Sequence, residues 1–70
     1  EIVKEIVVLS ASDSGYTKEI NLISWNGKEP KYDIRNFSPN REKCGKGITL
    51  TSDEAAALLK ALEKELNSGD

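Results

Sequence analysis

The residues of this chain that are equipped for chemistry are cations and aromatic rings, and they concentrate in its middle part. Basic side chains follow the phosphates of a single nucleic acid strand, and flat rings stack on its bases. We therefore expect a binding surface rather than a catalytic centre. The residues expected to contact nucleic acid are Lys18, Trp25, Lys31, Arg35, Phe37, Arg41, Lys43 and Lys46.

The distribution of charge supports this expectation better than the total does. The formal net charge is -2, yet residues 17–51 carry seven cations against four carboxylates. A partner responds to the local field rather than to the sum over the chain. On charge alone, an ordinary solvated surface explains this segment better than a binding site does.

The usual catalytic and metal-binding sets are missing from the sequence. It contains no histidine, which is the commonest general base and metal ligand, and its single cysteine, Cys44, has no second thiol for a disulfide or zinc site. Gly45-Lys46 resembles part of a phosphate-binding P-loop, but Asn40 and Gly47 replace the required glycine and hydroxyl residue. We expect no enzyme, no cofactor, no metal and no small-molecule substrate.

The rings and one ion pair allow alternatives. Trp25 is about equally well explained as a core anchor or as a stacking ring. Phe37 shares a strand face with Lys31 and Arg35, which favours exposure. Asp33 and Arg35 lie two residues apart on that face, and we expect a surface ion pair between them.

Four extended segments are expected, joined by short polar connections. Residues 2–9, 16–25, 32–37 and 48–50 are rich in β-branched or alternating apolar residues, and Asn26-Gly27 is a strong turn signal. Residues 38–47 are predicted to form a basic loop in which Gly45 and Gly47 adopt turn conformations. Such strands form an antiparallel meander.

A helix follows the strands. Thr51 and Glu54 have the spacing of a capping box, and an apolar stripe continues to Leu66 before Asn67-Ser68-Gly69 ends the helix. The first segment is apolar on both faces, so it needs cover on both sides. We expect the fold to be α+β and paired as a homodimer, with a core and dimer contact formed by Ile6, Val8, Leu58, Leu59, Leu62 and Leu66.

Length and composition indicate one domain spanning residues 1–70, which buries only about 60% of its unfolded surface and gains from a partner subunit. No apolar run reaches the roughly 18 residues of a membrane span. We expect a cytoplasmic protein without a membrane partner.

Asp33-Ile34-Arg35 and the run from Gly45 to Leu50, Gly-Lys-Gly-Ile-Thr-Leu, resemble the C-terminal domain of the positive cofactor four (transcriptional coactivator) family, particularly its bacterial single-domain members. The resemblance covers about residues 2–66. It implies a curved four-stranded sheet with one helix, paired as a homodimer, that binds single-stranded DNA without strong sequence preference. It also implies a bacterial, nucleoid-associated protein of transcription regulation or DNA maintenance.

By position, Arg35 resembles the family's strand arginine, Lys43 and Lys46 its loop lysines, and Trp25 the ring after the second strand. Ser38 stands where eukaryotic members carry a second stacking aromatic. Residues 1–70 hold no counterpart of their Ser- and Lys-rich regulatory arm, so we do not expect a coactivator role controlled by phosphorylation. The choice between DNA and RNA stays open. The competing hypothesis is a protein interaction module that pairs through the apolar first strand or an open sheet edge.

Overall fold

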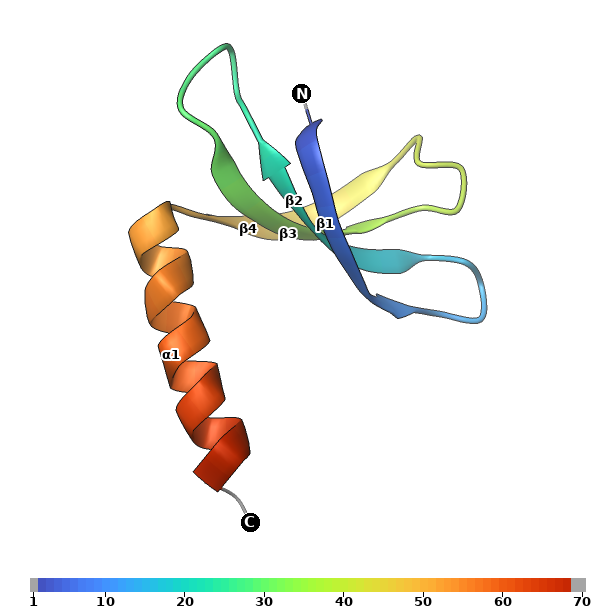
Figure 1. The fold of residues 1–70 in the computed structure, drawn as a ribbon. Helices are drawn as coiled ribbons and strands as arrows, with labels where there is room; N and C mark the ends of the chain where they lie inside the picture. Colours follow the sequence, from blue (N-terminus) through green and yellow to red (C-terminus); the bar gives the residue numbers. More distant parts are fainter. Residues whose placement is uncertain (1, 69–70) are drawn as a thin grey trace.

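The computed structural model describes residues 2–68, which form one antiparallel sheet followed by one helix (Figure 1). The elements are β1 (Ile2–Ala11), β2 (Thr17–Ile23), β3 (Lys31–Phe37), β4 (Cys44–Leu50) and α1 (Ser52–Ser68). The strands lie in the order β1-β2-β3-β4, each antiparallel to its neighbour. The predicted α+β meander with a C-terminal helix is confirmed.

The sheet has one polar and one apolar face. Asn21 pairs with Asp33 across β2 and β3 on the polar face, and Ile20 pairs with Ile34 on the apolar face. Because side chains alternate along a strand, Lys18 shares the apolar face with Ile20. The register thus shows which β2 side chains lie on which face of the sheet. Alternation along the sequence alone left this open.

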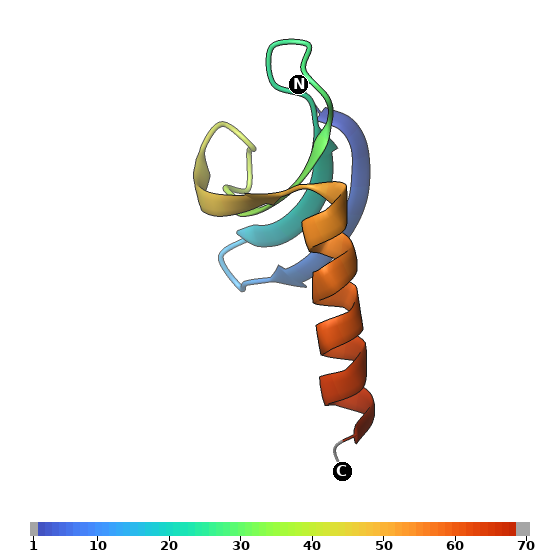
Figure 2. The ribbon, with the colours of Figure 1, turned by 90° about the vertical axis from the view of Figure 1, so that its left-hand side faces the viewer.

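The polar face is closed by curvature rather than by a second layer. Irregularities interrupt the β1–β2 register at three places, and β-bulges bend a strand and increase its twist. Figure 2 shows the bent strands with α1 running away from the sheet. Asn21 and Asp33 are only 1% and 0% exposed, although the helix packs toward the other face. The concave side of the sheet thus encloses polar groups.

The start of β4 corrects the predicted loop. The strand begins at Cys44, so Gly45 and Gly47 belong to it, and neither has a positive φ. A Cβ at position 47 would collide with the carbonyl oxygen of Ile34 and with the Cβ of Arg35. Glycine is present at position 47 because two strands approach closely there, which the sequence did not distinguish from a turn requirement.

The turn between β2 and β3 is as predicted. Asn26 and Gly27 have φ values of 54° and 74°, and the Lys28 amide donates to the Trp25 carbonyl at 2.9 Å. These left-handed conformations cost little for asparagine and glycine.

The capping box is also confirmed. The Thr51 amide donates to Glu54 Oε1 at 2.8 Å, and the Glu54 amide donates to Thr51 Oγ1 at 3.1 Å. These bonds satisfy two backbone donors that a helix start would otherwise leave without a partner.

The helix only partly covers the apolar face of the sheet. An apolar groove of about 400 Å³ lies between the sheet and the helix. Ile20, Ile34 and Leu50 line it on the sheet side, and Leu58 and Leu62 line it on the helix side. Among the described residues, α1 contacts β3 and β4 but neither of the other strands. The predicted core and dimer residues remain accessible in the single chain: Ile6 is 41% exposed, Val8 54%, Leu58 38%, Leu59 62%, Leu62 48% and Leu66 77%.

Candidate nucleic-acid interface

The turn from Ser38 to Lys43 is braced by its own polar side chains. The Ser38 amide donates to the Lys43 carbonyl at 2.9 Å, and the Lys43 amide donates to Ser38 Oγ at 3.1 Å. Ser38 Oγ also donates to Asn40 Oδ1 at 2.8 Å, and Asn40 Oδ1 accepts a second hydrogen bond from the Glu42 amide at 3.0 Å. Ser38 and Asn40 thereby hold Lys43 in place, a role that sequence reasoning missed although Ser-Pro-Asn is a turn composition.

Arg35 is bound to a fully buried carboxylate on the concave face. Its Nε donates to Asp33 Oδ2 at 2.6 Å and its Nη2 donates to Asp33 Oδ1 at 2.7 Å. Thr49 donates to the same carboxylate at 3.3 Å. The predicted pairing of Asp33 with Arg35 is present, but the expectation of a surface pair was wrong, since Asp33 is 0% exposed. The curvature of the sheet explains this burial.

Arg41 forms the second ion pair of this face. Its Nη1 donates to Glu19 Oε2 at 2.8 Å, and its guanidinium lies 4.5 Å from the centre of the Phe37 ring. Phe37 is half-buried rather than open, and one side of its ring is occupied. Arg41 reaches this position from the turn with a φ of 60°, a conformation that few residues other than glycine adopt.

These contacts shift three pKa values. The hydrogen bond from Thr17, at 2.6 Å, is the main reason that the pKa of Glu19 is lowered, and Arg41 acts in the same direction against the effect of burial. The hydrogen bonds to Asp33 and to Glu19 raise the pKa values of Arg35 and Arg41, respectively. Each of these three shifts favours the charged form of its group, which is the form that an ion pair requires.

Two of the predicted lysines lie on the other face. Lys18 pairs with Asn36, and both residues border a hollow of about 300 Å³ together with Lys46. The β3–β4 register places two β4 residues opposite Asn36, because Arg35 pairs with Gly47 and Phe37 with Cys44. Lys46 therefore points away from the side of the sheet that carries Arg35.

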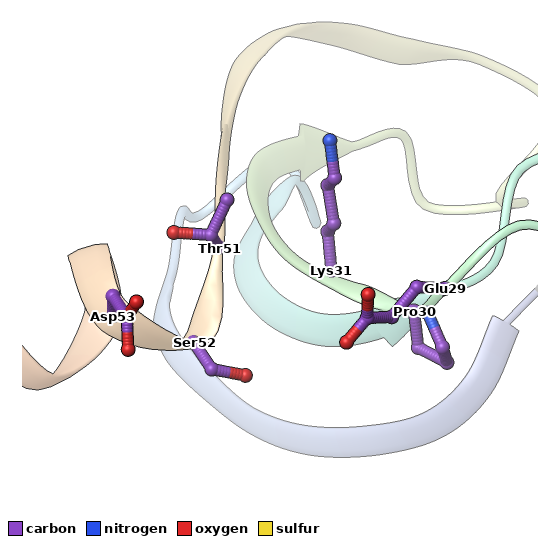
Figure 3. A pocket seen from close by; sticks show the side chains of 6 residues that line it. All are labelled: Glu29, Pro30, Lys31, Thr51, Ser52 and Asp53. Carbon is purple, nitrogen blue, oxygen red and sulfur yellow. The ribbon is translucent and has the colours of Figure 1, made fainter.

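Trp25 and Lys31 lie at the opposite end of the sheet from the Ser38–Lys43 turn. Trp25 is 46% exposed beside the β2–β3 turn, so it is not a core residue of the single chain. Lys31 borders a hollow of about 280 Å³ between this turn and the start of α1, and Figure 3 shows its ammonium group pointing away from Glu29. The seven residues of β3 span about 20 Å at roughly 3.3 Å per residue.

The structure thus sorts the predicted contacts into three groups. Arg35, Phe37 and Arg41 share the concave face, where the two arginines are paired with carboxylates. Lys18 and Lys46 share the opposite face, and Lys43 lies at the turn beside them. Trp25 and Lys31 stand at the far end of the sheet.

Residues 2–68 contain no group of three or more side chains that could together hold a metal ion. Nor does this part of the chain contain a helix of the length and apolar character needed to cross a membrane.

The chain is similar to a protein family and to a bacterial protein. A family model described as Transcriptional Coactivator p15 (PC4) matches residues 12–61. An uncharacterized protein of Treponema pallidum (strain Nichols) is 48% identical over 58 residues, which cover 83% of this chain and 68% of that protein. The family match extends from the β1–β2 connection into α1 and includes all eight predicted contact residues.

Proposed function

Because this chain belongs to the family of the transcriptional coactivator p15 (PC4), we propose that it binds single-stranded DNA without strong sequence preference. The family is one of nucleic-acid-binding domains, and the match over residues 12–61 is the observation that carries the proposal. We assign the whole chain to one such domain, which acts without catalysis in transcription regulation or DNA maintenance.

The arrangement of charge supports the proposal physically. Cations and rings occur at both ends of β2 and β3, with Trp25 and Lys31 at one end and Lys43 and Lys46 at the other. Lysines attract phosphates at any sequence, and every base can stack on an exposed ring. Groups of this kind discriminate weakly among sequences, and we keep the eight predicted residues as proposed contacts, distributed over the three groups described above.

We further propose that two copies of the chain pair through the apolar groove between sheet and helix. Its lining is entirely apolar apart from the hydroxyl of Tyr32, and the leucines of α1 stay largely exposed in one chain. Burying apolar area stabilises by about 25 cal/mol per Å². A second copy that offers its own leucine stripe supplies a matching surface, and a 70-residue chain gains stability from it.

Fluorescence anisotropy of labelled oligo-dT tests the binding proposal, with a duplex of equal length and an oligo-U strand as competitors. We expect oligo-dT to bind and the duplex to compete poorly. The oligo-U arm decides between DNA and RNA, since a protein that distinguishes them must read the 2′-hydroxyl. Failure to bind any single strand would overturn the proposal.

One observation favours a second candidate function, a protein interaction module. β1 is an edge strand, and its apolar side chains are exposed on both faces, for instance Val7 at 47% and Val8 at 54%. Unpaired edges of this kind accept a strand from another chain. This candidate predicts association with a peptide strand that does not respond to salt.

A further inference from the structure

The two arginines of the concave face have little capacity left for a ligand. Arg35 holds both oxygens of Asp33, and Arg41 is shared between Glu19 and the Phe37 ring. Their charges are neutralised locally by carboxylates that are themselves buried. A phosphate approaching this face meets two compensated ion pairs rather than free cations.

Free cations gather on the other side of the same end of the sheet. In the part of the chain that the structure describes, Lys18, Lys43 and Lys46 form no ion pair, and all three are exposed. Lys18 and Lys46 border one hollow, and Lys43 borders the next, which has a volume of about 250 Å³. Glu42 adds one negative charge to the second hollow. The three lysines outnumber it, so the two hollows together are positively charged.

The second hollow also contains an exposed aromatic ring. Tyr16 is 49% exposed, and within residues 2–68 its ring has no stacking partner and its hydroxyl no hydrogen bond. Its backbone is fixed by Ser12, whose Oγ accepts from the Tyr16 amide at 3.1 Å and whose amide donates to the Tyr16 carbonyl at 2.8 Å. The ring is therefore presented from a positioned backbone rather than from a free loop.

The two hollows follow one another along the end of β3, since one is lined by Asn36 and the other by Ser38, and together we call them the loop-end trough. Lys18 pairs with Asn36, and the next step of the same alternation sets Tyr16 beside Ser38, which is bonded to Lys43. Asn36 lines the hollow beside Lys18, and Ser38 lines the hollow beside Tyr16. The banks are formed by Tyr16 and Lys18 on the β2 side and by Lys43 and Lys46 on the β4 side.

We propose that this loop-end trough, bordered by Tyr16, Lys18, Lys43 and Lys46, is where a single nucleic acid strand is held most tightly, with a base stacked on Tyr16 and phosphates against the three lysines. The inference rests on the proposed function and deepens it, since it assigns a stacking ring absent from the predicted contacts. It also moves the main phosphate contacts from the arginines to the lysines.

The test measures oligo-dT affinity and its salt dependence for Tyr16→Ala, Lys18→Ala, Lys43→Ala and Lys46→Ala, with Lys60→Ala on the exposed helix as a matched charge control. Loss of one stacked base, roughly 1 to 3 kcal/mol, corresponds to about 5- to 150-fold weaker binding for Tyr16→Ala. Tyr16→Phe should retain most of the wild-type affinity, because it keeps the ring. Each lysine variant in the trough should make the salt slope shallower by about 0.7.

An abasic oligomer separates stacking from a structural effect of the Tyr16 change. Wild-type protein should bind it more weakly than oligo-dT, and Tyr16→Ala should cause no further loss. If oligo-dT binds but Tyr16→Ala leaves the affinity within twofold, the trough assignment is wrong while the proposed function stands. If wild-type protein binds no single strand, the proposed function itself fails.

Discussion

Arg35→Ala provides the sharpest test of how the concave face is built. The change removes two hydrogen bonds of 2.6 and 2.7 Å from the carboxylate of Asp33, which is 0% exposed. Among the described side chains, Thr49 alone would still donate a hydrogen bond to it. Breaking a buried ion pair by removing one partner typically costs 3 to 5 kcal/mol. The Arg35 side chain is 20% exposed, which lowers the expectation to about 3 kcal/mol.

That loss is large for a chain of this size. At roughly 0.05 to 0.15 kcal/mol per residue, a 70-residue domain has a free energy of unfolding of about 3 to 10 kcal/mol. Urea unfolding followed by circular dichroism at neutral pH measures the change, with the midpoint and slope compared to those of the wild-type protein.

The matched variant is Arg35→Ala combined with Asp33→Asn. An amide carries no charge to leave uncompensated, so the double variant should recover more than half of the stability lost by Arg35→Ala alone. A loss below about 1 kcal/mol for the single variant, or no recovery in the double variant, would refute the reasoning.

Three further outcomes are expected. Leu62 is 48% exposed in one chain and so is available for a dimer contact. Leu62→Asp should therefore sediment as monomers or unfolded chains, whereas Lys60→Ala should not. A folded dimer of Leu62→Asp would argue against the groove as the dimer contact. Gly47→Ala should lower the free energy of unfolding in urea by about 1 to 3 kcal/mol. Gly45→Ala should lower it clearly less, because a Cβ at position 45 would make only an ordinary 3.8 Å contact. Equal losses would contradict the close approach of β3 and β4 at position 47. Because the pKa of Glu19 is lowered in the folded protein, its carboxylate stabilises the fold at pH values above the unfolded pKa of about 4.3. This stabilisation is lost as the pH falls through the folded pKa, so Glu19→Gln should make the free energy of unfolding fall less steeply in acid. An unchanged acid dependence would contradict this role of Glu19.

The fold was predictable where local chemistry and global structure agree. Asn26 and Gly27 tolerate the left-handed backbone that the β2–β3 turn needs, and the spacing of Thr51 and Glu54 allows both to cap the helix. Period-two alternation located β2 and β3. These signals act over a few residues, so they can be read without knowing how the strands assemble.

The burial of polar groups was not predictable in this way. Glu19, Asn21 and Asp33 would normally mark the solvent face of a strand, yet all three are buried because the sheet closes on its polar side. That curvature accompanies the irregularities of the β1–β2 pairing, which depend on a partner strand that the sequence of β2 does not specify. The ion pair between Arg41 and Glu19 spans 22 residues and has no local signature.

The candidate site shows the same division. The cations were identifiable from composition, but their separation into paired arginines and free lysines depends on register. Tyr16 is not among the eight predicted contacts, because nothing in its neighbourhood along the chain indicates that Ser38 and Lys43 lie across from it. Asn36 and Ser38 are shorter than the side chains of Tyr16, Lys18, Lys43 and Lys46 around them, which leaves a hollow at the end of β3.

The salt dependence of wild-type affinity for oligo-dT tests the central claim most directly. Neutralising Z phosphates of a single strand releases counterions, so the logarithm of the affinity should fall linearly with the logarithm of salt concentration, with a slope near -0.7Z. With the three lysines of the trough as the minimum, we predict a slope of about -2 or steeper. An affinity that does not change with salt would contradict the account.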